Sequence, residues 1–524
     1  MSADGGGGGG GARKGPRRGA GGNRSQGQGQ GRGRGGGPHG KGRGGGRPRS
    51  DRERGFGAGP GTGRHRGSGK PRGGRERTVD PARTVARDVL RAVREREAYA
   101  NLLLPKLLAD RGISGRDAAF ATELTYGAAR ELGLLDAVIA AAADRPVGDI
   151  DPEILDDLRL GAYQLLRTRV PAHAALSTTV DLVAADAGRG ASGFANAVLR
   201  RVTGASAEEW IDRLTPDAAA GPVAALAFAH SHPEWIAQAF ADALGADAGQ
   251  LSDALAADNI APQVHLVARP GEISAEELAL ITGGEPGTYS PYAVHLDGGD
   301  PGRLEPVRER LAAVQDEGSQ LIALATYRAP VTGEDTGRIL DLCAGPGGKT
   351  ALIGALAAID GRHVDAVEPA PHRAKLVSAA TDGLPVTVHT VDGRDSGLEP
   401  GYDRVLVDAP CTGLGALRRR PEARWRRTAA DVRELVSLQR ELLGAAAALT
   451  RPGGVIVYAT CSPHLAETRR VVADAVRRHG LIELDTPALV PEVTDPGPGP
   501  HVQLWPHRHG TDAMFFAALQ VPDP

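Results

Sequence analysis

From Gly337 onward the sequence alternates short apolar runs with segments of helical composition, and this alternation constrains the fold more than any other feature. The apolar runs are RILDLC, HVDAVE, VTVHTV, RVLVDA and VIVYAT. Short apolar runs separated by helical stretches predict an α/β domain with a mainly parallel sheet. Ligands of such sheets bind at the carboxyl ends of the strands. We therefore expect the functional side chains of residues 336–522 where these runs end.

A glycine-rich turn follows the first run. Gly345, Gly347 and Gly348 lie in CAGPGGKT, between the strand RILDL and the apolar helix ALIGALAAI. Glycine lets the backbone approach a ligand closely, and a helix start offers unpaired N–H donors. A nucleoside triphosphate loop would need glycine in place of Cys343, and a dinucleotide turn would need glycine or alanine in place of Thr350. The remaining candidate ligand is S-adenosylmethionine.

The ribose diol of S-adenosylmethionine calls for a carboxylate at the end of the next strand. Glu368 ends HVDAVE, 20 residues beyond Gly348, which is the spacing of a strand–helix–strand unit. Asp392 in VDGRD follows the third run and is a candidate partner for the adenine amino group, with Asp395 as its rival. The turn and these acids together predict a cofactor site.

Two cysteines lie where later runs end. Cys411 follows Asp408 in VLVDAPC, and Cys461 ends VIVYATC. A lone cysteine is most often a packing residue, but two strand-end thiols should reach the same sheet edge as the glycine-rich turn. A thiolate that adds to carbon 6 of cytosine activates carbon 5, and a base must then remove the carbon-5 proton before the thiol leaves. The pair predicts methyl transfer with a covalent step.

The first 79 residues have a different composition. They contain 19 Lys and Arg but 4 Asp and Glu, whereas the whole chain of 524 residues has 62 and 64. Few aliphatic side chains are present to offset the entropy of ordering. We predict a disordered, basic, Gly/Arg-rich tail over residues 1–78, and such a tail is typical of an RNA contact.

The composition changes at Asp80. Asp80 precedes Pro81, a helix-start signal, and Val85, Val89 and Val93 then recur along one helical face. Helical patterns continue without strand-like alternation, so we predict an all-helical domain over residues 79–205. The less distinctive residues 206–335 predict a linker and a small α+β subdomain.

Three cysteines are too few for a disulfide framework, and Cys343, Cys411 and Cys461 lack the spacing of a zinc site. The chain has no signal-like start and no apolar stretch of membrane-spanning length. We expect a cytoplasmic monomer that binds neither a metal nor a membrane.

Two resemblances to known families follow from these motifs. RLGAYQLL, PAHAAL and GFANAVLRR resemble the all-helical, RNA-binding NusB family. DLCAGPGGKT, DAPCTGLG followed by RRRPEARW, and YATCSPHLAET resemble the RNA cytosine methyltransferases of the NOL1/NOP2/Sun family. The second resemblance implies a Rossmann-like class I S-adenosylmethionine-dependent methyltransferase. The pairing of both domains is similar to bacterial enzymes that modify small-subunit ribosomal RNA.

The resemblance also implies residue roles. Cys461 is the expected nucleophile, Cys411 assists release, and Asp408 stabilises the target ring near its nitrogen 3. Glu368 departs from the Asp often found there, which leaves the geometry of the ribose contact open. The implied cofactor-binding residues are Cys343, Ala344, Gly345, Pro346, Gly347, Gly348, Lys349, Glu368, Asp392 and Asp408. The expected RNA contacts are Arg418, Arg419, Arg420 and Arg424, with Trp425 stacking on a base.

Other functions stay open at this stage. DNA cytosine methylases place their nucleophile in a Pro-Cys motif, which would be Cys411 here and would leave Cys461 without a role. A transfer RNA substrate is an alternative, as is an inactive RNA-binding or antitermination-type factor. Zinc deamination is excluded because its combined pattern of H-x-E with P-C-x-x-C is missing.

Overall fold

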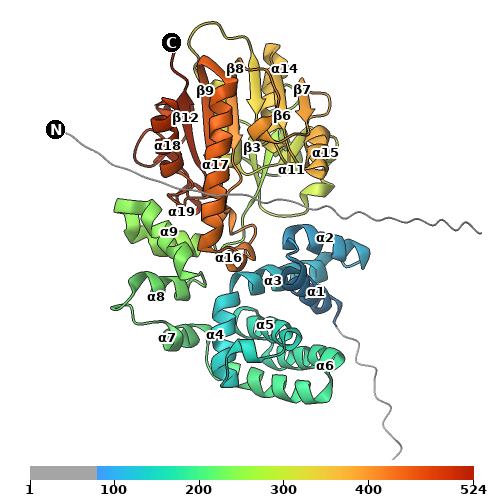
Figure 1. Ribbon diagram of the computed structural model, residues 1–524. Helices are drawn as coiled ribbons and strands as arrows, with labels where there is room; N and C mark the ends of the chain where they lie inside the picture. The colour runs from blue at the N-terminus through green and yellow to red at the C-terminus, as the bar shows by residue number, and fades with distance from the viewer. Residues whose placement is uncertain (1–79, 524) are drawn as a thin grey trace, which may run out of the picture. The chain divides into compact units, whose positions relative to one another are not determined.

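The structure is a computed structural model that describes residues 80–523. The predicted disordered tail, residues 1–78, lies outside this range. The described chain begins with helices and reaches its first strand only at Val264 (Figure 1). A helical region therefore precedes the α/β region, which confirms the fold class predicted from the sequence.

The helical region starts at the predicted cap. Asp80 accepts a hydrogen bond from the Arg83 N–H at 2.9 Å, and Asp151 accepts one from the Glu153 N–H at 2.9 Å. Proline follows each cap, where its missing N–H has no cost. The helices are α1 (Pro81–Arg96), α2 (Ala100–Asp110), α3 (Gly115–Arg130), α4 (Leu132–Ala143), α5 (Pro152–Arg167), α6 (Ala172–Val202) and α7 (Ala207–Leu214).

In the connector, three short helices precede a small sheet. The helices are α8 (Pro222–Ala229), α9 (Glu234–Leu244) and α10 (Leu251–Ala257). The antiparallel sheet has the order β2-β3-β1-β4 and consists of β1 (Val264–Ala268), β2 (Glu285–Pro286), β3 (Ala293–Leu296) and β4 (Ala312–Val314). Helices α11 (Ala275–Thr282) and α12 (Glu305–Arg308) accompany this sheet, and α13 (Glu317–Arg328) leads into the next domain.

The α/β domain is built on one larger sheet. Its main path runs β10-β12-β9-β8-β5-β6-β7. The pairs from β9 to β7 are parallel, as the sequence predicted, and β12 is antiparallel to β9. The strands are β5 (Arg338–Asp341), β6 (His363–Val367), β7 (Val386–His389), β8 (Tyr402–Asp408), β9 (Thr450–Thr460), β10 (Ile482–Glu483), β11 (Val502–Gln503) and β12 (Phe515–Gln520).

Helices cover both faces of this sheet, because its strands are apolar on both sides. Ile339 belongs to the core shared with α13 and α14, whereas its neighbour Leu340 belongs to the core shared with α17 and α18. Figure 1 shows α17 running along the sheet beside β9. The helices are α14 (Gly348–Asp360), α15 (Pro371–Ala380), α16 (Ala423–Arg426), α17 (Ala429–Leu449), α18 (Arg469–His479) and α19 (Pro506–His509).

Candidate active site

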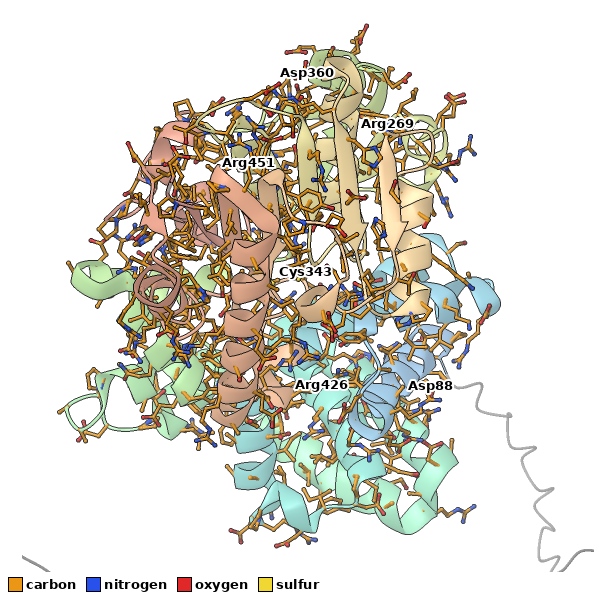
Figure 2. All side chains as sticks on the ribbon, turned by 45° about the horizontal axis from the view of Figure 1, so that its top comes forward. Asp88, Arg269, Cys343, Asp360, Arg426 and Arg451 are labelled. Atoms are coloured by element: carbon orange, nitrogen blue, oxygen red, sulfur yellow. The ribbon has the colours of Figure 1, made fainter. Side chains whose placement is uncertain are left out.

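The carboxyl ends of four neighbouring parallel strands form the site. Strands β6, β5, β8 and β9 lie next to one another in this order. Cys343 follows β5, Glu368 follows β6, Cys411 follows β8 and Cys461 follows β9. Figure 2 labels Cys343 at this end of the sheet. Parallel pairing therefore brings together side chains that are more than 100 residues apart in sequence.

The two predicted catalytic cysteines are in contact. Their sulfur atoms are 3.4 Å apart, and both side chains are partly exposed. The hydrogen bond to Cys461, together with burial, raises the pKa of Cys411 well above its usual value. The hydrogen bond from Cys411 lowers the pKa of Cys461, against the effect of burial, and the charges of Lys349 and Arg420 act in the same direction. Cys461 is thus the more acidic of the two thiols, and the roles of the two cysteines stay predictions.

Glu467 connects the turns that carry the two cysteines. This buried carboxylate accepts hydrogen bonds from the Thr412 N–H at 2.8 Å, the Thr412 hydroxyl at 2.5 Å and the Ser462 hydroxyl at 2.7 Å. Gln439 also donates to Glu467, at 3.2 Å, and to the Pro410 carbonyl at 2.9 Å. Because Thr412 and Ser462 directly follow the cysteines, one carboxylate fixes the spacing of both turns.

A lysine and two aspartates lie around the glycine-rich turn. Lys349 Nζ forms an ion pair with Asp408 Oδ2 at 2.7 Å. Asp341 accepts a hydrogen bond from the Thr350 hydroxyl at 2.7 Å, and burial raises the pKa of Asp341 to about 6. The ion pair holds the Lys349 ammonium group beside Asp408, and the charge of Lys349 lowers the pKa of Cys461.

The glycine-rich turn has no room for side chains at two of its positions. A Cβ at Gly345 would overlap Glu368 Oε2, and Gly347 has a φ of 111° with the Val377 Cα only 2.9 Å from the position of a Cβ. Glu368 is 2% exposed, and Arg373 donates to the Gly345 carbonyl at 2.7 Å. A carboxylate beside a turn without side chains, followed by free helix N–H groups, fits a ribose and a charged amino-acid arm.

The third acid of the predicted cofactor site is more exposed. Asp392 caps a short turn, and its ion pair with Arg394 lowers its pKa to about 2. A Cβ at Gly393 would lie 2.9 Å from the Leu342 carbonyl, so this turn packs against the start of the glycine-rich loop. Asp395 is exposed. The adenine contact of Asp392 stays a prediction.

The structure corrects our sequence interpretation of the predicted RNA-binding segment. Arg418 is 6% exposed and bonded to Asp512 and Asp316, and Arg419 is bonded to the same two carboxylates. These two guanidinium groups neutralise buried acids, so they are not free for phosphate. Arg420 is exposed, as an RNA contact requires, and lies 5.8 Å from the centre of the Tyr99 ring.

Arg424 and Trp425 are interdomain contacts. Arg424 is fully buried and donates to the carbonyls of Arg130, Ser231 and Asp258. The Trp425 indole donates to the Ala129 carbonyl at 2.9 Å. These bonds satisfy backbone acceptors at the end of α3, so the segment holds the helical domain against the catalytic domain instead of offering both side chains to RNA. Figure 2 labels the neighbouring Arg426, which donates to the Glu97 and Ala98 carbonyls.

The comparisons with known proteins agree with this geometry. The model described as "16S rRNA methyltransferase RsmB/F" matches residues 328–520, and the NusB family model matches residues 80–204. A protein of Mycobacterium tuberculosis that is named as a methyltransferase is 64% identical over 450 residues, covering 86% of this chain and 98% of that protein. The chain belongs to the RsmB/F methyltransferase family.

Other relatives of this RsmB/F protein extend over both domains. The ribosomal RNA small subunit methyltransferase B of Escherichia coli is 33% identical over 451 residues, covering 83% of this chain and 98% of that protein. The solved structure of PH0851 shares the fold, with a TM-score of 0.68, 22% identity and coverage of 84% of this chain and 99% of that one. As an RsmB/F enzyme the protein uses S-adenosylmethionine, which confirms the predicted cofactor.

One feature of the site lay beyond the sequence interpretation. Glu467 stands six positions after Cys461 in the same motif, and that proximity was the available signal. Between residues 80 and 523, no helix is both long and apolar enough to cross a bilayer.

Proposed function

We propose that this RsmB/F methyltransferase transfers a methyl group to carbon 5 of a cytosine in 16S ribosomal RNA through a covalent bond to Cys461. The observation that carries the proposal is the 3.4 Å contact between Cys411 and Cys461, with the pKa of Cys461 lowered and that of Cys411 raised. A thiolate is the nucleophile that this chemistry needs. The names of the relatives support the RNA class.

In the first step the Cys461 sulfur bonds to carbon 6 of cytosine, and the electron pair of the 5,6 double bond becomes available at carbon 5. S-adenosylmethionine, when bound, supplies an electrophilic methyl group. The Cys343 to Lys349 turn with Glu368 and Asp392 holds this donor in our proposal, and Asp408 contacts the ring near nitrogen 3. Carbon 5 gains the methyl group while it still carries its proton.

Release depends on Cys411. Its raised pKa comes first from the hydrogen bond to the Cys461 sulfur. Once that sulfur is bonded to the ring, it no longer carries a negative charge, so the main cause of the raised pKa is removed. Cys411 then gives up its proton more readily and acts as the base that removes the carbon-5 proton. The electrons of the carbon–hydrogen bond restore the double bond, and the Cys461 sulfur leaves.

A pair of substitutions tests this assignment. We expect Cys461→Ala to abolish methylation, and Cys411→Ala to retain the ability to attack and to accumulate a covalent protein–RNA adduct on denaturing gels. Small-subunit ribosomal RNA and transfer RNA are assayed in parallel. An adduct with Cys461→Ala and none with Cys411→Ala would reverse the roles, as in the DNA cytosine methylases.

The RNA itself is tested separately. Bisulfite mapping of small-subunit ribosomal RNA from cells with and without this gene should show one cytosine that loses its methyl group. An unchanged ribosomal RNA map together with a changed transfer RNA map would replace the substrate and keep the chemistry.

A further inference from the structure

Gln315 is a buried polar side chain that has no protein partner. It follows β4, is 7% exposed, and neither its amide oxygen nor its amide nitrogen has a hydrogen-bond partner. A buried amide without partners lowers the stability of the fold. Its backbone is well held, because the Gln315 N–H donates to the His265 carbonyl and the Gln315 carbonyl accepts from Gln320. The backbone therefore positions an amide that lacks partners within the protein.

The free amide lies beside the start of α14. A Cβ at Gly348 would lie 3.6 Å from Gln315 Nε2 and 3.7 Å from its Cδ. Gly348 is the first residue of this 13-residue helix, whose first N–H groups have no partner within the helix. A helix start and an unpartnered amide in contact form a place for a ligand that carries a negative group.

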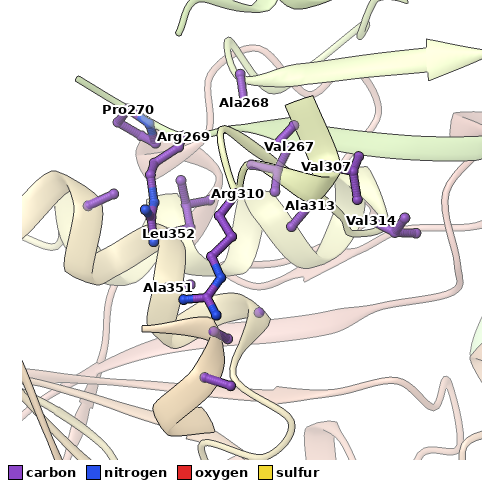
Figure 3. Close-up of a pocket in the computed structure, with 15 residues that line it drawn as sticks. Val267, Ala268, Arg269, Pro270, Val307, Arg310, Ala313, Val314, Ala351 and Leu352 are labelled. Carbon is purple, nitrogen blue, oxygen red and sulfur yellow. The ribbon is translucent and has the colours of Figure 1, made fainter. Parts of the chain in front are cut away.

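A neighbouring cavity does not account for Gln315. This cavity of about 240 Å³ is lined by Val314, Gly348 and Ala351, and also by Arg269 and Arg310 (Figure 3). Gln315 is not among its lining residues. The amide is thus not part of that mostly apolar cavity.

The arrangement of the other groups decides which part of the cofactor meets Gln315. The ribose is expected at Glu368, beside Gly345 at the opposite end of the turn from Gly348. The methyl group must face Cys461. The third substituent on the sulfonium is the chain that carries the α-carboxylate and α-ammonium groups. This chain therefore lies on the remaining side, next to Gly348. The amide of Gln315 offers both a donor for the carboxylate and an acceptor for the ammonium group.

We infer that Gln315 binds the amino-acid end of S-adenosylmethionine. This inference rests on the cofactor site used in the proposed function. It assigns the small connector sheet a direct part in cofactor binding, because Gln315 directly follows β4 of that sheet. It also gives a reason for the contact between the connector and the start of α14, next to the glycine-rich turn.

The test compares two ligands by calorimetry. S-adenosylhomocysteine carries the amino-acid end, and 5′-methylthioadenosine keeps the adenine, ribose and thioether but lacks it. We expect Gln315→Met, which conserves volume, to weaken S-adenosylhomocysteine about tenfold and methylthioadenosine less than about twofold. The melting temperature without ligand should stay equal or rise, because the substitution removes an unpartnered buried amide.

Gln503→Met is the matched control. Gln503 is 4% exposed, and its amide donates to the carbonyls of Leu504 and Met514. This variant should lose stability and keep both affinities. Equal weakening of both ligands in Gln315→Met, or no weakening of either, overturns the inference and leaves the cofactor site intact. If the unsubstituted protein binds neither ligand, the cofactor site of the proposed function fails, and the inference fails with it.

Discussion

The loop after β8 contains two regions that differ in how well their sequence predicts their role. Its beginning carries Cys411, which lies where the parallel sheet leads it, in contact with Cys461. Its end carries Arg424, which is fully buried against the helical domain. Strand topology determines where a strand-end side chain arrives, whereas a run of positive charge does not reveal which acceptors it meets.

The largest expected effect is on the cysteine side. Glu467→Ala removes the carboxylate that Thr412 and Ser462 share. We expect the rate of methylation to fall by at least about a hundredfold, because misplaced reacting groups lose much of their effective concentration. Single-turnover assays with radiolabelled donor measure this. A loss of stability with an unchanged rate in the folded fraction would show that the network supports the fold alone.

The next effect is on the arginine side and concerns stability. Arg424→Met leaves three backbone carbonyls without a donor. We expect the free energy of unfolding to fall by about 3 kcal/mol, measured by urea denaturation. The salt dependence of RNA binding should stay the same, since a buried guanidinium neutralises no phosphate. A flatter salt dependence would restore Arg424 as an RNA contact.

A pH profile sharpens the assignment of the thiolate. Lys349 lowers the pKa of Cys461, and Asp408 raises it. Lys349→Met removes the favourable charge and leaves Asp408 without its partner, so the pKa of Cys461 should rise. A rate that depends on the thiolate increases with pH through this pKa. We expect the rising limb of single-turnover methylation to move to higher pH, with saturating donor to compensate for weaker binding.

Arg420 provides the counterpart to Arg424. It is exposed, and its charge contributes to the lowered pKa of Cys461. We expect Arg420→Ala to keep the melting temperature, to weaken RNA binding by about fivefold, and to reduce the slope of affinity against salt by about one contact. Filter binding over a salt series measures both. Unchanged affinity would remove Arg420 from the predicted RNA contacts.

The smallest effect lies in the helical domain. Asp157 is 1% exposed, neither of its oxygens has a hydrogen-bond partner, and burial raises its pKa to about 7. A folded-state pKa above the unfolded value near 4 makes stability fall as pH rises from about 4 to about 7. We expect Asp157→Asn to raise stability by about 1 kcal/mol at pH 8 and less at pH 5. Thermal melts at the two pH values test the sign.

Much of the site was predictable because local patterns encode it. Cys411, Cys461 and the glycine-rich turn all end strands, and adjacent parallel strands bring such residues to one edge. The fold class followed from the same alternation. The roles of Arg418 and Arg424 were not predictable, because their partners are Asp512 and backbone carbonyls more than 90 residues away. Charge pattern alone does not report such long-range pairing.

The burial of Arg424 has a consequence for how a substrate is selected. Its donors meet carbonyls from separate segments, at Arg130, Ser231 and Asp258, so sliding or rotation of the helical domain against the catalytic domain would break several hydrogen bonds at once. In our proposed function, these bonds set the spacing between the helical bundle and the cysteine pair. We therefore expect the enzyme to favour RNA in which the reactive base and a second contact on the bundle are separated by that spacing.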